Sequence, residues 1–208
     1  MDTKLVPMLH ETKVTFNKKA IFKTAQNRQQ EFKKKMKFQE IEITNDTIYF
    51  KEGFPIILLT ITETSLRIVS LFREKENVYK EIRHILETLG FSHEDKITIS
   101  QFELVYLLNI GSEEELHNFF INSIDNKELG EIIESTMRFK TLKDNKEVMY
   151  FFKFNSGEAS VANISLESPV ETEVNNNLIE AFIEAEKFLF DNMDCFLRTR
   201  DVSLVSRG

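Results

Sequence analysis

The last part of the sequence carries a long periodic apolar pattern. Its members recur at intervals of three and four residues, the spacing of one face of an α-helix. They are Leu178, Phe182, Ala185, Leu189, Met193 and Phe196. Ser168 is a favourable N-cap, Pro169 suits the first helical position, and Glu171 can complete a capping box. The pattern predicts an amphipathic helix over 171–197, about 40 Å long. Further apolar residues widen its face, so we expect this helix to pack along a sheet.

Most of the chain before this helix is typical of β-strands, with apolar and polar residues in alternation. The segment 56–61 is apolar throughout, as in a central strand buried on both faces. Tight turns are expected at Asn45-Asp46, whose side chains tolerate a positive φ, and at Glu63-Thr64 and Ser156-Gly157. The predicted strands span 12–16, 38–44, 48–50, 56–61, 66–71, 96–110, 132–140, 148–154 and 159–166.

Three shorter segments have helical spacing. Residues 74–89 place their apolar side chains on one face, and Gly90 follows where a left-handed C′ residue is required. A capping box at 112–115 precedes a second apolar stripe. The basic segment 17–37 has only a narrow stripe, so a helix there would have to dock on the rest of the protein to be stable.

This order of elements predicts an α+β fold. Few connections are long enough for parallel crossovers, so we expect mainly antiparallel sheet, with the C-terminal helix packed on it. We divide the chain into a basic N-terminal strand and arm (1–37), an α+β domain (38–197) and a tail (198–208). The domain is either one compact unit or two related lobes, 38–110 and 112–197. A helix apolar on more than one side also suggests a homodimer.

Charge is distributed unevenly along the chain. The net charge is −7, yet residues 1–40 carry ten basic and four acidic side chains, which leaves −13 on the remainder. The basic arm either contacts a polyanion such as nucleic acid, or pairs with the acidic body of its own chain. The second interpretation is favoured, because charge runs are usually solvated faces. The candidate polyanion-contacting residues are Lys18, Lys19, Lys23, Arg28, Lys33, Lys34, Lys35 and Lys37.

The sequence motifs argue against the common catalytic and cofactor sites. The six glycines stand singly, so neither a P-loop nor a dinucleotide-binding loop can form. No two histidines are four residues apart; His84 and His93 are close enough to meet at a helix end, but a metal pair is the less favoured interpretation. We therefore expect no catalytic, metal or cofactor residues. An enzyme with carboxylates that the sequence does not identify remains an alternative.

These observations favour a non-enzymatic binding or accessory protein. It would act through protein–protein contacts, with nucleic acid as an alternative partner through the basic arm. The abundant aromatic residues, 19 Phe and four Tyr, form either a Phe-rich core or an exposed groove, and the core is favoured. The N-terminus lacks a signal-peptide pattern and no apolar run is long enough to span a bilayer. We expect a cytoplasmic protein of a prokaryote or phage that does not bind membranes.

Three segments resemble a sporadically distributed family of uncharacterised prokaryotic proteins. They are the Pro-apolar-x-Glu strand at Pro7 to Glu11, the strand at 102–110, and the strand at 160–166 followed by the long helix. The resemblance implies an α+β fold and no assigned reaction. Val105 stands where that family usually has arginine, and Asn163 and Ser165 stand where it often has aspartates. A site built from those residue types is therefore not expected in this chain.

Overall fold

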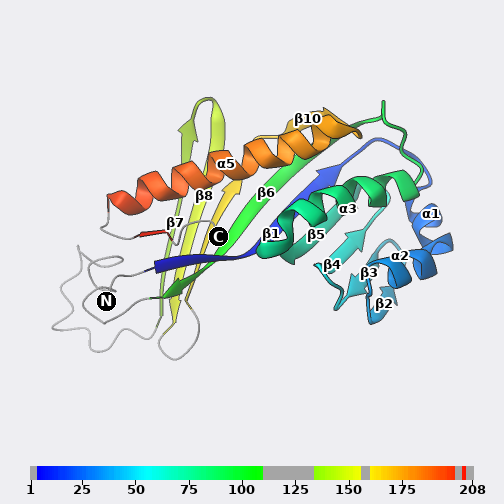
Figure 1. Ribbon diagram of the computed structural model, residues 1–208, viewed down its shortest axis with the longest axis horizontal. Coiled ribbons are helices and arrows are strands. Elements are labelled where there is room, and N and C mark those ends of the chain that lie inside the picture. The colour runs from blue at the N-terminus through cyan, green and yellow to red at the C-terminus, as the bar shows by residue number, and fades with distance from the viewer. Residues whose placement is uncertain (1–3, 110–133, 156–159, 200–202, 205–208) are drawn as a thin grey trace.

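The computed structural model describes residues 4–109, 134–155, 160–199 and 203–204 (Figure 1). The first half contains β1 (Lys4–Thr15), α1 (Ile21–Asn27), α2 (Gln29–Lys35), β2 (Glu40–Ile43), β3 (Ile48–Lys51), β4 (Ile56–Ile61), β5 (Ser65–Leu71), the 3₁₀ turn η1 (Phe72–Glu74) and α3 (Lys75–Thr88). The second half contains β6 (Lys96–Asn109), β7 (Glu134–Lys143), β8 (Lys146–Asn155), β9 (Ser160–Leu166), β10 (Val170–Glu173), α5 (Asn176–Arg198) and β11 (Ser203–Leu204).

All of these strands belong to one sheet. Its order is β2-β3-β4-β5-β1-β6-β9-β8-β7, with β10 paired to β6 and β11 paired to β1. Every pair is antiparallel except β1–β11, which is parallel. The predicted α+β class, with mainly antiparallel sheet and a long C-terminal helix on it, is confirmed.

The sheet has two halves that meet at the pair β1–β6. The first half begins with β1 and the second with β6. The last strand of the meander that follows, β5 in the first half and β9 in the second, pairs with the strand that begins its half. A helix then follows, α3 in the first half and α5 in the second. The connectivity therefore divides the chain between α3 and β6, and places β1 at the centre of the sheet.

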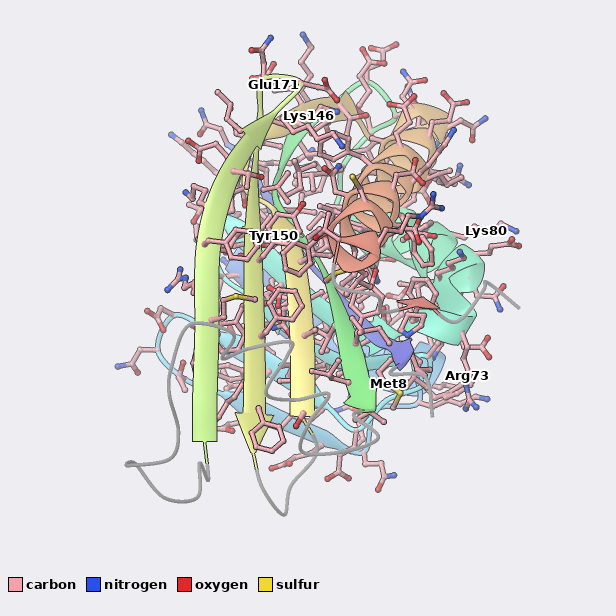
Figure 2. The ribbon with its side chains drawn as sticks, turned by 90° about the vertical axis from the view of Figure 1, so that its left-hand side faces the viewer. Met8, Arg73, Lys80, Lys146, Tyr150 and Glu171 are labelled. Atoms are coloured by element: carbon pink, nitrogen blue, oxygen red, sulfur yellow. The ribbon has the colours of Figure 1, made fainter. Side chains whose placement is uncertain are left out.

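The helices lie on one face of the sheet, and the core lies between. Phe50 on β3 and Phe102 on β6 both face this side, in rows of buried side chains. The ring of Phe32 from α2 lies 5.6 Å from Phe50, and Phe182 from α5 lies 6.0 Å from Phe102 and 5.1 Å from Tyr79 of α3. Figure 2 shows the same arrangement at the other end of the sheet, where Tyr150 of β8 lies toward α5. Most of the aromatic residues that the structure describes thus lie in or against the core, the interpretation that the sequence favoured.

The predicted start of the C-terminal helix is wrong. Residues Val170–Glu173 form β10, which pairs with the first residues of β6. The helix begins later, where Asn175 Oδ1 accepts a hydrogen bond of 2.8 Å from the Asn177 N–H. Ser168 Oγ accepts instead from the Glu147 N–H at 2.7 Å. The start of β6 extends beyond β9 and needs a hydrogen-bonding partner, so sheet pairing replaces the first turn of the expected helix.

The basic segment after β1 folds as two short helices docked on the sheet. Ile21, Ala25, Phe32 and Met36 are buried, and α1 contacts β3 and β4. The carboxylate of Glu63 accepts a 3.0 Å hydrogen bond from the Phe22 N–H at the start of α1, where negative charge is favourable. The expectation that a helix here must dock is met, and residues 21–35 are part of the folded body.

Within the described residues, the predicted turns lie where the sequence places them, but the turn with two positive φ angles is a different one from that expected. Gly90 has φ +93 and ends α3 as predicted, with Phe91 N–H bonded to Leu86 O. Hairpin turns occur at Asn45-Asp46 and Glu63-Thr64, but the central pair with positive φ is Asp144-Asn145 between β7 and β8. The capping box at 112–115 and the Ser156-Gly157 turn lie outside the described residues. In the tail, Ser203–Leu204 pair with β1.

Candidate binding site on the open face of the sheet

The face of the sheet opposite the helices is open: within the described ranges, no helix packs on it. Side chains on this face alternate along each strand with the buried side chains that face the helices. Many of the open-face side chains are apolar and only half-buried. They are Leu9, Leu58, Val69, Leu71, Val105, Leu107, Met149, Phe151 and Val161. Half-buried apolar groups on several neighbouring strands are typical of a contact surface.

Two carboxylates lie at the centre of this face. Glu11 of β1 and Glu103 of β6 are directly opposite each other in the β1–β6 register. Arg67 of β5 donates from Nε to Glu11 Oε1 at 2.6 Å and from Nη2 to Glu11 Oε2 at 3.0 Å. These bonds raise the pKa of Arg67. Like charges opposite each other are unfavourable, and the guanidinium compensates Glu11.

Glu103 is held by amides. Asn163 Nδ2 donates to Glu103 Oε1 at 2.6 Å, and Gln101 Nε2 donates to Oε2 at 3.1 Å. Burial, followed by the charge of Glu11, raises the pKa of Glu103, while the two amide hydrogen bonds and the charge of Arg67 act in the opposite direction. In the described part of the chain Glu103 has no ion pair.

A pocket of about 180 Å³ lies beside Glu103, between β6, β9, β8 and β7. Its lining combines carboxylates, amides, a guanidinium and apolar side chains: Gln101, Glu103, Arg138, Met149, Phe151, Asn163, Ser165 and Glu167. Asn163 Oδ1 is buried and has no hydrogen-bond partner among the residues that the structure describes. Arg138 Nε contacts Met149 Sδ at 3.4 Å, and Glu167 is paired with Lys140 at 2.6 Å. The pocket therefore offers an unused acceptor next to a carboxylate.

The strand register brings several of the positions named in the sequence analysis together at this place. Glu11 is opposite Glu103, Glu103 is opposite Ser165, and Val105 is opposite Asn163. The positions that the resemblance singled out are thus neighbours on the open face, although their residue types differ. Sequence reasoning missed Arg67, Gln101 and Glu103. The one available signal was Glu103 itself, a carboxylate within the mainly apolar run 102–108.

The predicted polyanion-contacting residues lie elsewhere, on and around α1 and α2, far from β7 in Figure 1. Lys18 Nζ lies 2.7 Å from Asp95 and 4.8 Å from the centre of the Phe91 ring. Arg28 pairs with Glu31 at 3.5 Å and Lys35 with Glu81 at 3.9 Å. The other candidates form no ion pair with any described residue: Lys19, Lys23, Lys33, Lys34 and Lys37. The structure therefore pairs part of this basic set with the chain's own carboxylates.

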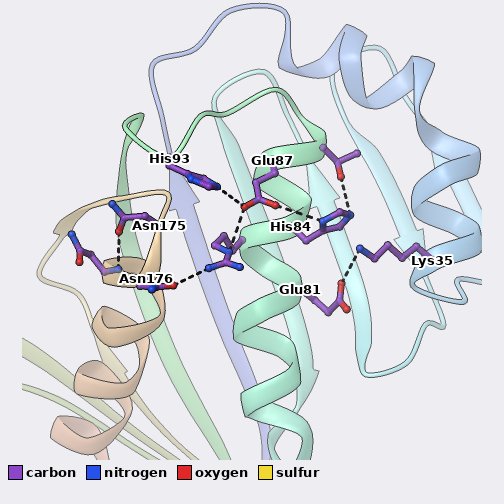
Figure 3. Close-up of polar contacts among 10 residues, drawn as sticks. Lys35, Glu81, His84, Glu87, His93, Asn175 and Asn176 are labelled. Atoms are coloured by element: carbon purple, nitrogen blue, oxygen red, sulfur yellow. Dashed lines mark hydrogen bonds and ion pairs between the residues drawn. The ribbon is translucent and has the colours of Figure 1, made fainter.

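The three histidines in the described residues are His10, His84 and His93, and only the last two approach each other. His84 and His93 come together on Glu87, at 3.6 and 3.2 Å, but Arg83 Nε also contacts Glu87 at 3.4 Å (Figure 3). Arg83 Nη1 donates to Asn176 Oδ1 at 3.0 Å, which connects α3 to the start of α5. Over the described ranges, no group of three or more His, Cys, Asp or Glu side chains is arranged to hold a metal ion.

A buried polar cluster lies under the helices. His10 is fully buried, with Nδ1 at 2.8 Å from Ser70 Oγ, and burial lowers its pKa to about 3. Nearby, Glu186 accepts from Tyr79 Oη at 3.0 Å and from Lys75 Nζ at 2.7 Å. His10 is therefore a neutral core residue, and the open face is the better candidate for function.

Comparison with known proteins adds no family assignment: no protein-family model matches the chain, and no curated protein matches its sequence. Among the helices in the described residues, none combines the length and apolar character that crossing a membrane requires.

Proposed function

We propose that this chain is a non-enzymatic binding or accessory protein that acts through protein–protein contacts made by the open face of its sheet. The observation that carries the proposal is the set of half-buried apolar side chains around Glu11, Arg67 and Glu103. The nine neighbouring strands have 4 to 14 residues and, at about 4.8 Å spacing, make a face roughly 40 Å wide. A standard protein–protein interface takes about 800 Å² from each partner, so part of a face of this width is enough.

A protein fits this face better than a nucleic acid does. Acidic side chains such as Glu11, Glu40 and Glu103 lie among basic ones such as Lys51 and Arg67. Nucleic-acid surfaces instead concentrate basic residues along the path of the phosphates. Mixed charge around apolar patches is typical of protein interfaces, whose rims are polar.

We place this activity in the cytoplasm of a prokaryote or phage and extend the proposal to a homodimer. The chain has a mass of 24.4 kDa, and Ile183 on the outer side of α5 is 52% exposed. Light scattering at micromolar concentration should give twice that mass. A value of 24.4 kDa would remove the dimer from the proposal and leave the open-face contact unchanged.

Affinity capture from the native host tests the contact surface directly. Val161→Glu places a charge on the open face, whereas Ile43→Glu makes the same change at a 40% exposed strand position on the other face. Wild type and Ile43→Glu should retain a stoichiometric protein partner, and Val161→Glu should lose it while keeping its circular dichroism spectrum. Equal capture by both variants would show that the open face is not the contact surface.

The runner-up is an enzyme, favoured by the Glu11–Glu103 pair. Two facing carboxylates in different environments, one bound by Arg67 and one with a raised pKa, are the arrangement that general acid–base catalysis uses. Metal-dependent turnover by the purified chain, abolished in Glu103→Gln and without any captured partner, would favour this alternative.

A further inference from the structure

We propose that the pocket between β6, β9 and β8 receives the guanidinium group of an arginine from the partner protein. This inference rests on the proposed function, because it names what the partner inserts into the open face. Three features of the pocket support it: an unused acceptor, a carboxylate that forms no ion pair with any described residue, and an aromatic wall.

The unused acceptor is Asn163 Oδ1. The orientation of this amide is fixed because Nδ2 donates to Glu103 Oε1 at 2.6 Å, and a carboxylate oxygen needs a donor. Oδ1 is then the free end, and it is buried with no hydrogen-bond partner in the described part of the chain. A buried acceptor that has lost water and gained no donor is unfavourable. A donor entering the pocket would remove this penalty.

The second feature is Glu103, which forms no ion pair with any described residue, although the charge of Arg67 acts on it from a distance. Arg67 donates two hydrogen bonds to Glu11, whereas Glu103 accepts hydrogen bonds from the neutral amides of Asn163 and Gln101. A cation beside Glu103 would also offset the repulsion from Glu11 across the β1–β6 pair. The pocket chemistry therefore selects a group that is both positively charged and rich in donors.

A guanidinium meets these requirements better than an ammonium. Its planar fork can donate to Glu103 and to Asn163 Oδ1 together, and its faces stack on aromatic rings. Phe151 supplies such a ring on the pocket wall, with Met149 beside it. Arg138 on β7 places a positive charge at the pocket, and among the described residues its Nε donates to the weak acceptor Met149 Sδ. Arg138 should therefore weaken the binding of a second guanidinium.

The test is an NMR titration of the ¹⁵N-labelled full chain with N-acetyl-L-arginine amide. The side-chain amide signals of Asn163 and Gln101 should shift, because both groups contact Glu103. N-acetyl-L-citrulline amide, a neutral compound of the same shape, should shift them at least tenfold less at equal concentration, and N-acetyl-L-lysine amide should bind more weakly than the arginine probe.

Three variants should affect the affinity for the arginine probe differently. Glu103→Gln should weaken the arginine probe at least tenfold, Arg138→Gln should tighten it severalfold, and Glu40→Gln, an exposed residue on β2, should leave it unchanged. If citrulline or lysine binds as well as arginine, or if Asn163 does not respond, the inference is wrong. The wild-type probe comparison decides this even if a variant fails to fold.

The arginine probe and the Val161→Glu capture experiment can fail separately. If Val161→Glu loses the partner but the arginine probe does not bind, the open face is the contact surface and the pocket takes something else. If the probe binds as expected but Val161→Glu still captures the partner, the arginine pocket stands and the wider contact surface does not.

Discussion

Glu11 and Glu103 face each other across the two central strands, but only Glu11 is bound by Arg67. A sheet that needed only stability would not place a second carboxylate there, since like charges opposite each other are unfavourable. Two amides, from Asn163 and Gln101, hold Glu103 in place instead. At the centre of the open face, therefore, two like charges meet and only one of them is compensated by an ion pair among the described residues.

The first prediction concerns the pH dependence of this site. Burial raises the pKa of Glu103, so the folded protein holds that proton more tightly than the unfolded chain does. The stability that Glu103 contributes to the folded protein is therefore fully present at a pH below the ordinary glutamate pKa. It is lost as the pH rises through the raised pKa of Glu103. Glu103→Gln should be more stable than wild type near neutral pH, and the difference should vanish at acidic pH.

Urea denaturation of both proteins across this range measures the effect. Leu142→Gln, at a 71% exposed position on β7, introduces the same glutamine without removing a titrating group; it is the control and should follow wild type at every pH. A Glu103→Gln protein that is less stable than wild type at neutral pH would mean that the amide hydrogen bonds to the carboxylate outweigh its burial.

The second prediction concerns His10, whose pKa is lowered to about 3 by burial. The unfolded chain binds a proton at the ordinary histidine pKa, so between that value and about 3 protonation favours unfolding. Wild type should lose about 2 kcal/mol between about pH 7 and pH 5 from this residue alone. His10→Gln, which keeps a hydrogen-bonding partner for Ser70, should lack this component.

A control for His10 is Leu142→Gln, because the Leu142 side chain is 71% exposed and does not titrate. The loss of stability between neutral pH and pH 5 should be the same in Leu142→Gln as in wild type. An identical loss in His10→Gln would place the acid sensitivity of the fold elsewhere.

The third prediction concerns α5 as a core element. Leu189 is completely buried, whereas Ile183 on the same helix is 52% exposed. Leu189→Ala should reduce the free energy of unfolding by about 2–5 kcal/mol, because it leaves a cavity against the sheet. Ile183→Ala should change it by about 0.5 kcal/mol or less. Similar losses in the two variants would contradict the packing of α5 seen here.

Local sequence signals predicted the elements whose causes are local. The left-handed C′ position at Gly90 follows from the end of an apolar stripe and needs no tertiary contact. The start of α5 could not be predicted in the same way. Ser168 and Pro169 are good helix-start residues, but the unpaired end of β6 binds Val170–Glu173 as a strand first. The local helix signal is overridden because the backbone of β6, more than seventy residues earlier in the chain, pairs with these residues.

The candidate site depends on register, which alternation alone does not give. Glu11, Arg67, Glu103 and Asn163 come from four strands and meet only because of the order β5-β1-β6-β9. Nothing in the spacing of these residues indicates that β1 pairs with β5 and β6 at once. The half-buried apolar side chains of the open face were equally unpredictable, since alternation does not say which face a helix will cover.

The last prediction concerns the basic surface of α1 and α2. If these lysines bind nucleic acid, log affinity should fall with log salt concentration by about 0.7–0.9 for each phosphate contact. Lys35 is already near Glu81, and Lys18 and Arg28 also pair with carboxylates. At physiological salt the screening length is about 8 Å, so the acidic body of the chain still opposes a polyanion close to its surface. We therefore expect only weak binding under these conditions.

The measurement is a salt titration of wild type against a variant in which Lys33, Lys34, Lys35 and Lys37 are changed to Gln. Both proteins should bind single- and double-stranded DNA and RNA weakly at about 150 mM salt. The variant should also keep the fold, because these side chains are mostly exposed while the docking residues Phe32 and Met36 are buried. Submicromolar binding by wild type that disappears in the variant would overturn this expectation and make nucleic acid the leading partner.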